Sequence, residues 1–385
     1  MEQRYLKTTR DLIRIPSIAE NHEAIFDAIR FVKGYFNDTD ARITKYEHRG
    51  KPSIVIATEE IKKGKNGTRD FDVILSGHLD VVDAPREMFV PRVEDGKLFG
   101  RGAADMKSEV AVMMEVMKEI LVEKQNGGVV PKVALMLTTD EEQGGANGVG
   151  YLVDEIGYRA KAVFVPDGGE DLDEVIITAK GFAHIRITGE GVSVHGSRPW
   201  LGENAILKVV KAFQAAEAEF SVPECRDSIK DENGHWHSTC VFGKISGGTA
   251  VNTVPVFAEC EMGVRFVEPA SLEDVFSRVK TLAEKEGCRA ELLAGGEMRI
   301  TEEDNEILAA YRDIVKKETG TFPRLQRTHG ADDGRFFSQY GIPVIMSRPS
   351  SGGQHSDNEW VDLSSLNDFY NICREFVRFF GTKEK

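Results

Sequence analysis

Short apolar runs recur along the chain, and polar residues follow each of them directly. The runs span residues 73–75, 133–137, 162–165 and 342–346. Continuous apolar residues are typical of strands that are buried on both faces of a sheet. An amphipathic helical pattern occupies 108–123, and a further helical pattern follows at 363–380. Strands that alternate with helices predict an α/β fold with a mostly parallel sheet.

The pattern changes between residues 178 and 294. The segment "GFAHIRITGE" alternates between apolar and polar positions, as a half-buried strand does. After it come a helix, two strands, a second helix and a last strand, at 203–220, 238–245, 255–266, 272–286 and 289–293. This β-α-β-β-α-β order is that of the ferredoxin-like unit. We therefore predict an inserted α+β domain at 178–294, within a discontinuous main domain made of 1–177 and 295–385.

The polar residues after the apolar runs, and in the Gly-rich segment "GRGAADMK" before the first helix, are of types that bind metals or transfer protons. They are His78, Asp80, Asp105, Glu141, Glu142, Asp167 and His355. Ligands of open α/β sheets bind beyond the carboxyl ends of the strands, so we expect these side chains to converge on one site. Close carboxylates repel one another, and divalent cations are the natural way to hold them together. Imidazoles and carboxylates without cysteine favour zinc, with manganese or cobalt as alternatives, and two ions fit the number of groups better than one.

Composition restricts the partners of the protein. The chain has 385 residues, too many for one core, and a formal net charge of −14. This charge argues against a nucleic acid or an anionic membrane as partner. No apolar stretch is long enough to span a membrane, and the first residues lack the apolar core of a signal peptide. The five scattered cysteines include no C-x-x-C pair, so we expect free thiols and a cytoplasmic location.

Five motifs carry a resemblance to a known family. "SGHLDVV", "GRGAADMK", "TTDEEQGG", "PDGG" and "HSDNEW" occur in an order and spacing that resemble the co-catalytic zinc amidohydrolases and peptidases. That family includes acetylornithine deacetylase, succinyl-diaminopimelate desuccinylase, aminoacylase, glutamate carboxypeptidase and the cytosolic di- and tripeptidases. The resemblance implies a catalytic metal-binding domain at 1–177 and 295–385, and an inserted domain that acts as a lid and a dimer contact.

The resemblance also implies roles for the strand-end residues. Asp105 would bridge two metal ions; His78 and Asp167 would complete one site, and Glu142 and His355 the other. Asp80 would accept the second N–H of His78 and so set its tautomer. The peptide bond Asp105–Met106 would be cis.

Glu141 is left over as a non-ligand. Metal ions acidify water, but a base must still take its proton and return it to the leaving amine, and we predict that Glu141 does this. The alternative is a surface glutamate in an acidic loop.

The inserted domain carries further candidates by resemblance. His195 would donate a hydrogen bond to the tetrahedral oxyanion, often across the dimer, and Asn252 and Arg265 would bind polar groups of the substrate. The alternatives are an ordinary loop histidine for His195 and a salt-bridged strand residue for Arg265. In the main domain, "GADDGRFF" resembles the segment beside the specificity pocket, so Arg335 is a candidate substrate ligand. The "HWH" segment at 235–237 is more typical of a solvated loop than of a metal site.

These observations favour a hydrolase that cleaves the amide bond of a small N-acyl amino acid, of the deacetylase, desuccinylase or aminoacylase type. Asp167 stands where the deacetylases usually have glutamate, which instead favours a metallo-dipeptidase, tripeptidase or carboxypeptidase of the same family. An inactive binding homologue is a remote alternative, because Glu141 is present. We expect a homodimer, and a substrate with a free α-carboxylate that Arg265 recognises as a fork.

Overall fold

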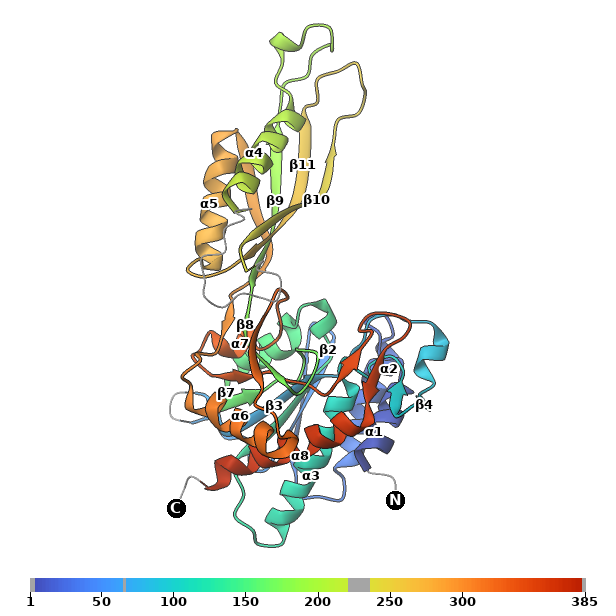
Figure 1. Ribbon diagram of the computed structural model, residues 1–385. Coiled ribbons are helices and arrows are strands. Elements are labelled where there is room, and N and C mark those ends of the chain that lie inside the picture. The colour runs from blue at the N-terminus through green and yellow to red at the C-terminus, as the bar shows by residue number, and fades with distance from the viewer. Residues whose placement is uncertain (1–3, 65–66, 221–235, 383–385) are drawn as a thin grey trace. The chain divides into compact units, whose positions relative to one another are not determined.

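The computed structural model describes residues 4–64, 67–220 and 236–382 (Figure 1). The chain divides into two compact units. The first comprises Met1–Ile177, Ile300–Gln326 and Asp332–Lys385, and the second comprises Thr178–Arg299 and Arg327–Ala331. The predicted insertion, 178–294, lies within the second unit.

A six-stranded sheet forms the centre of the first unit. Its strand order is β1 (Arg42–His48), β2 (Lys51–Ala57), β6 (Val133–Thr138), β3 (Arg69–His78), β7 (Tyr158–Phe164) and β15 (Val344–Ile345). The last four of these strands are parallel, while β1 and β2 run antiparallel at one edge. The predicted α/β fold with a mostly parallel sheet is therefore confirmed.

Successive residues of the central strands enter cores on opposite faces of this sheet. Val73 and Leu75 of β3 pack in a core formed with α1 (Arg4–Ile13), α2 (His22–Tyr35), α3 (Lys107–Gln125), α6 (Glu306–Thr319) and α8 (Leu363–Thr382). Ile74 packs on the other face, with the π-helix η3 (Ala146–Ile156) and α7 (Arg335–Ser338). Helices thus cover both faces, which explains why the strands read as continuous apolar runs.

The prediction that the helix at 108–123 is amphipathic is wrong. Every residue of α3 from Lys107 to Met117 is buried, whichever way its side chain points. The reason is that α3 packs against the sheet strands β3 and β6 and also against α1 and α8. A helix enclosed in this way has no solvent face along most of its length.

The structure also contains two small sheets. In one, β16 (Ser351–Gly352), β17 (Trp360–Asp362), β5 (Lys97–Phe99) and β4 (Arg92–Glu94) lie in that order. This sheet places the loop that contains His355 beside the loop that follows β5 and contains Asp105. The other sheet has the order β13 (Arg299–Ile300), β8 (Glu174–Ala179) and β14 (Arg324–Thr328).

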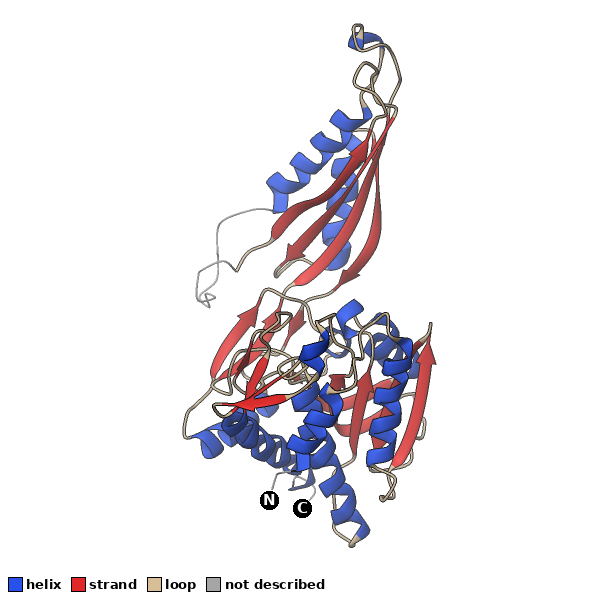
Figure 2. Cartoon of the chain, turned by 90° about the vertical axis from the view of Figure 1, so that its right-hand side faces the viewer, coloured by secondary structure: helices blue, strands red, loops and turns tan. Residues whose placement is uncertain are grey.

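The second unit has the predicted element order. It consists of β9 (Gly181–Glu190), α4 (Ala205–Phe220), β10 (Thr239–Gly247), β11 (Phe257–Phe266), α5 (Leu272–Lys285) and β12 (Cys288–Gly296). The strands are antiparallel in the order β10–β11–β9–β12, with both helices on one face of the sheet (Figure 2). This is the strand arrangement of a ferredoxin-like unit. Strand β10 lies at an edge and exposes Val241 and Ile245.

Two sequence-based expectations concern the whole chain. None of the helices in the part of the chain that the structure describes is long and apolar enough to cross a membrane. The described cysteines, Cys240, Cys260, Cys288 and Cys373, are buried free thiols. Cys225 lies outside the described residues.

Candidate metal centre

Five of the predicted residues form two groups of potential metal ligands that share one carboxylate. His78, Asp105 and Asp167 make one group, and Asp105, Glu142 and His355 the other, with the ligand atoms of each group within 4.8 Å of one another. The two oxygens of Asp105 point to different groups. Its Oδ1 lies 3.0 Å from His78 Nε2, and its Oδ2 lies 3.2 Å from His355 Nε2. Asp105 therefore has the geometry of a bridging carboxylate.

The fold explains why these residues meet. His78 is the last residue of β3 and pairs with Thr138, the last residue of the parallel strand β6. The short helix η2 (Glu141–Gln143) follows β6, and Asp167 follows β7. Their side chains therefore project from the same edge of the sheet, because the carboxyl ends of parallel strands lie together there. Asp105 and His355 come from the loops beside the small sheet, and His355 takes a positive φ of 58°.

The electrostatics of the cluster fit a site for cations. Burial and the charge of Asp105 raise the pKa of Asp167 well above its usual range, and burial also raises that of Glu142. Burial and the charge of Asp167 raise the pKa of Glu141 to about 10. Without positive charge beside them, these carboxyl groups bind protons more tightly than free carboxyl groups do. Cations that occupy the two groups would favour the ionised forms, so the residues present fit a pair of divalent ions.

His78 is oriented by the main-chain oxygen of Asp80, while the Asp80 carboxylate lies beside the ring as a negative charge. Its Nδ1 lies 3.0 Å from the main-chain oxygen of Asp80 and 3.6 Å from the carboxylate Oδ1. Burial lowers the pKa of His78, but its contacts with Asp105 and Asp80 outweigh this and raise the pKa well above its usual value. Asp80 Oδ2 accepts a hydrogen bond from the main-chain N–H of Glu142 at 3.1 Å. Asp80 thus contacts residues of both ligand groups. The Asp105–Met106 peptide bond is cis, as the resemblance implies.

Glu359 is a site residue that the sequence analysis missed. This carboxylate is fully buried, and its Oε1 accepts from the N–H groups of Ala104 and Asp105, at 2.8 and 3.0 Å. Its Oε2 accepts from Gly102 N, at 3.0 Å, and from Arg101 Nη1, at 2.5 Å. Glu359 therefore fixes the loop that carries the shared ligand. Its place in the motif "HSDNEW", four residues after His355, was the available signal.

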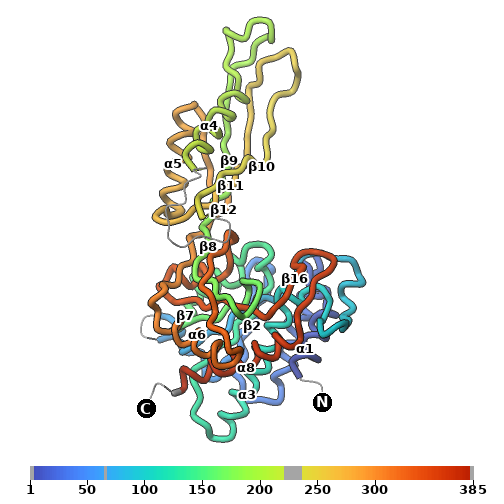
Figure 3. Tube along the Cα trace, in the orientation of Figure 1, coloured from blue at the N-terminus to red at the C-terminus, as the bar shows by residue number. Residues whose placement is uncertain are grey.

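The predicted residues of the inserted domain fall at two distant places in the second unit. His195 and Asn252 are neighbours, because Gly196 N donates to Asn252 O at 2.7 Å and His195 bridges to Thr253. His195 follows β9 and Asn252 precedes β11. The loop after β9 and the loop before β11 extend beyond the same end of this sheet (Figure 3). Arg265 lies at the other end of β11, where its guanidinium stands over Phe182, 5.4 Å from the ring centre. At about 3.3 Å per residue, the eight steps from Phe257 to Arg265 alone span about 26 Å.

Arg335 is a buried residue whose guanidinium faces the main chain. It donates to the main-chain oxygens of Asp332 and Gly144, both at 2.6 Å. Gly144 directly follows Glu141–Gln143, so Arg335 supports the turn that carries the candidate base. The structure thus shows a positioning contact where the sequence predicts a substrate ligand.

The prediction of a solvated loop at 235–237 is wrong at Trp236. This residue is 2% exposed, and Lys180 Nζ and the Arg327 guanidinium lie 5.3 and 5.1 Å from its ring centre. His235 lies outside the described residues.

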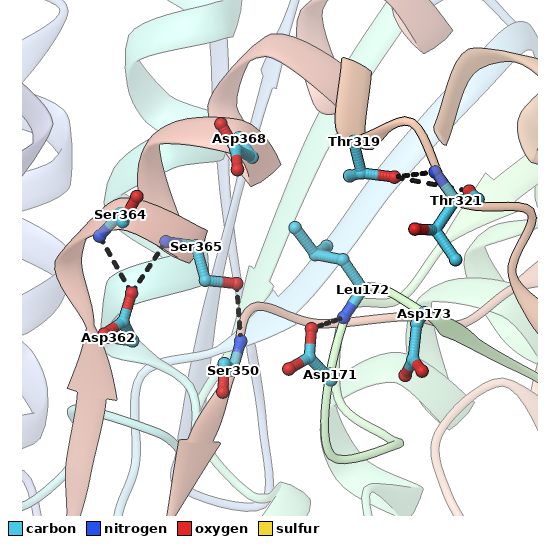
Figure 4. A pocket seen from close by; sticks show the side chains of 10 residues that line it. All are labelled: Asp171, Leu172, Asp173, Thr319, Thr321, Ser350, Asp362, Ser364, Ser365 and Asp368. Atoms are coloured by element: carbon cyan, nitrogen blue, oxygen red, sulfur yellow. Dashed lines mark hydrogen bonds between the residues drawn. The ribbon is translucent and has the colours of Figure 1, made fainter. Parts of the chain in front are cut away.

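A separate cavity of about 380 Å³ in the first unit contains none of the predicted site residues (Figure 4). Aspartates and hydroxyl groups line most of it, and the chain itself uses several of them. Asp362 accepts hydrogen bonds from Ser364 N and Ser365 N at the start of α8, and Asp171 accepts one from Leu172 N. The cavity therefore does not change the assignment of the site.

Comparison with known protein families matches residues 74–378 to Peptidase family M20/M25/M40. The chain belongs to this family. It is 30% identical to a succinyl-diaminopimelate desuccinylase from Bordetella petrii over 360 residues, which are 88% of this chain and 92% of that protein. The resemblance inferred from the motifs is thereby confirmed, and this M20 chain is a metallohydrolase of linear amide or peptide bonds.

Solved structures of M20 proteins share its fold. A metallo-carboxypeptidase from Sulfolobus solfataricus superposes with a TM-score of 0.75 and 16% identity, over 99% of this chain and 100% of that one. A tripeptidase from Staphylococcus aureus superposes with a TM-score of 0.72 and 21% identity, over 100% of this chain and 99% of that one. At these identities the likeness concerns the fold alone.

Proposed function

We propose that the protein hydrolyses the amide bond of an N-acyl amino acid at a centre of two divalent metal ions. The observation that carries the proposal is the pair of ligand groups joined by Asp105, with the half-buried Glu141 beside them. The similarity to succinyl-diaminopimelate desuccinylases supports the N-acyl amino acid as the substrate class. Zinc fits two imidazoles among carboxylates, and cobalt or manganese are alternatives.

His78, Asp105 and Asp167 would hold one ion, and Asp105, Glu142 and His355 the other. Bound ions of this kind polarise a carbonyl group and acidify water. Glu141 would take the proton of the attacking water and later pass it to the leaving nitrogen. For this the carboxyl must be ionised, and cations near it would lower the pKa that burial and Asp167 raise.

The hydrogen bonds of His195 suit it to stabilise an oxyanion. Ser197 N donates to His195 Nδ1 at 3.2 Å, and Ser197 Oγ lies 2.8 Å from the same nitrogen. A main-chain N–H can only donate, so Nδ1 is an acceptor and the neutral ring carries its proton on Nε2. His195 would therefore present an Nε2–H donor to the tetrahedral oxyanion.

His195 and Arg265 would serve one active site from different subunits. One lid holds them too far apart for both to contact a single small substrate, because at least the length of β11 separates them. In a twofold dimer, Arg265 of one subunit and His195 of the other can approach the same cleft. The exposed edge strand β10, with Val241 and Ile245, offers a surface on which a second copy would pair.

Asp167 favours a second candidate function. Aspartate at this position is more typical of the dipeptidase and tripeptidase branches than of the deacetylases, so cleavage of short peptides is the alternative. A peptide with a free amino terminus and an N-acyl amino acid differ on the acyl side of the scissile bond. Substrate selectivity therefore distinguishes the two functions.

The test is a hydrolysis screen with zinc, cobalt or manganese added. Succinyl, acetyl and formyl amino acids are compared with dipeptides and tripeptides. We expect the succinyl or acetyl compounds to give the highest kcat/KM, and Glu141→Gln to lower kcat by roughly 100- to 10,000-fold. Glu155→Gln, an exposed glutamate of the same unit, is the matched control and should retain activity. Turnover of peptides alone would replace the proposal with the peptidase alternative, and full activity without metal would refute both.

A further inference from the structure

Arg348, in the segment between β15 and β16, belongs to neither ligand group but contacts the loops of both. Its Nε donates to the main-chain oxygen of Gly169 at 2.6 Å, and its Nη1 lies 3.4 Å from that of Ala104. The Gln354 carboxamide is taken in the orientation in which both its oxygen and its nitrogen face suitable hydrogen-bond partners. Its oxygen then accepts hydrogen bonds from Arg348 Nη1 at 3.1 Å and from Arg348 Nη2 at 2.9 Å. One guanidinium thus joins three separate segments of the chain.

Each of these acceptors is within two residues of a candidate ligand. Ala104 directly precedes Asp105, Gln354 directly precedes His355, and Gly169 is two residues after Asp167. The guanidinium is planar and directs its five N–H groups in fixed directions, so acceptors on three loops are held in one geometry. The position of one ligand-bearing loop therefore depends on the positions of the other two.

Two local features show why such a contact is needed. His355 has a φ of 58°, in a region that costs a residue with a Cβ atom free energy unless its surroundings hold it there. Gln354, its neighbour, is anchored by Arg348. Both main-chain polar groups of Ala104 are held, since its N–H donates to Glu359 and its C=O accepts from Arg348.

The charge of Arg348 also acts on the buried carboxyl groups nearby. Burial raises the pKa of Glu109 well above its usual value, and the positive charge of Arg348 opposes that rise. Neither carboxyl oxygen of Glu109 has a hydrogen-bond partner among the described residues. Arg348 therefore contributes positive charge to a region that is otherwise rich in carboxylates.

We propose that Arg348 is a positioning residue that preorganises the loops of Asp105, Asp167 and His355 for metal binding. The proposal rests on the proposed function, which assigns these residues as ligands. Outer contacts of this kind typically change metal affinity by about 10- to 100-fold when they are removed. Once both ions are bound, the ligands themselves hold the loops, so kcat at saturating metal should change much less than the affinity.

The sign of the effect separates positioning from simple electrostatics. A positive guanidinium repels a divalent cation, so electrostatics alone predicts that Arg348→Met binds metal more tightly. Positioning predicts the opposite, weaker binding. Arg348→Lys keeps the charge but cannot span the three acceptors, so it should also bind more weakly than the wild type, though with a smaller loss than Arg348→Met.

The experiment is a Co²⁺ titration of the metal-free protein, followed by the visible absorption of the bound ion and not by activity. We expect two ions per chain in the wild type, and dissociation constants about 10- to 100-fold higher in Arg348→Met. Arg159→Met is the matched control. Arg159 is half-buried in the same unit, and its Nη1 donates to two main-chain oxygens, of Val153 and Tyr158, both at 2.7 Å. Its variant should bind Co²⁺ as the wild type does.

The outcomes distinguish the two proposals. Unchanged or tighter Co²⁺ binding by Arg348→Met would overturn the role of Arg348 while leaving the metal centre intact. A wild-type protein that binds no Co²⁺ would instead overturn the proposed function. If circular dichroism shows that Arg348→Met does not fold, Arg348→Lys decides, and wild-type affinity in that variant would refute positioning by the planar fork.

Discussion

Replacement of Glu359 by glutamine tests whether one buried carboxylate holds the loop of the shared ligand. The carboxylate accepts four hydrogen bonds, two on each oxygen, from Gly102 N, Ala104 N, Asp105 N and Arg101 Nη1. Glutamine has the same shape, but its NH₂ group is a donor. Whichever way the amide turns, two of the four donors lose their acceptor, and the buried Arg101 loses its negative partner.

The expected loss of stability follows from these contacts. A hydrogen bond to a charged group contributes about 1.5–3 kcal/mol, so two lost bonds cost about 3–6 kcal/mol. Removal of one partner of a buried ion pair costs about 3–5 kcal/mol. This second figure covers the same loss of contacts and is not added to the first. We therefore expect Glu359→Gln to lower the free energy of unfolding of the first unit by about 4 kcal/mol. For a domain of this size the loss corresponds to a Tm lower by about 8–16 °C.

The assay is urea and thermal unfolding of the metal-free protein at pH 8. Burial raises the pKa of Glu359, while the amide donors and Arg101 oppose the rise, so an alkaline pH keeps the wild-type carboxyl ionised. Glu94→Gln is the control, because Glu94 is exposed and pairs with Arg92 at 3.8 Å. The control should change stability by less than about 0.5 kcal/mol. A loss below about 1 kcal/mol in folded Glu359→Gln protein would refute the reasoning, since it would mean that the donors find other acceptors.

Three further predictions concern the dimer, the substrate and pH. Mixing Glu141→Gln with His195→Ala subunits should restore about a quarter of the wild-type activity. Half of the dimers formed are mixed, and each mixed dimer has one intact site out of two. If proven heterodimers recover no activity, His195 acts in the site of its own subunit. Arg265→Lys should lower kcat/KM for an N-acyl amino acid by roughly 10- to 100-fold, and the methyl ester of that substrate should be similarly poor with the wild type; equal kcat/KM for acid and ester would exclude carboxylate recognition. Burial and the charge of a neighbouring aspartate raise the pKa of Asp333 to about 7. This group therefore contributes stability that is complete below its unfolded pKa, near 4, and is lost as the pH rises through 7. The Tm of the chelated protein should fall between pH 5 and 8, and a rising Tm over that range would contradict the assignment.

The sequence alone was sufficient for the mostly parallel strands of the central sheet and for the convergence of the candidate ligands, but not for the strand order or for the antiparallel strands β1 and β2. Runs such as 133–137 are continuously apolar because helices cover both faces of the sheet. The carboxyl ends of parallel strands lie at one edge of a sheet, which brings His78, Glu142 and Asp167 together there. The order of the inserted domain was also readable, because each of its strands alternates between a covered and an uncovered face. Such local periodicities are properties of consecutive residues.

Only the tertiary structure decided which residues support the ligands and which candidates lie together. Glu359, Arg348 and Arg335 act largely on main-chain groups of other loops. A main-chain N–H or C=O is the same for every sequence, so the segments that contain these residues do not specify their partners. The burial of α3 on all sides likewise depends on what packs against it. The length of β11, finally, separates His195 from Arg265, because each of the eight steps from Phe257 to Arg265 along the extended strand adds about 3.3 Å.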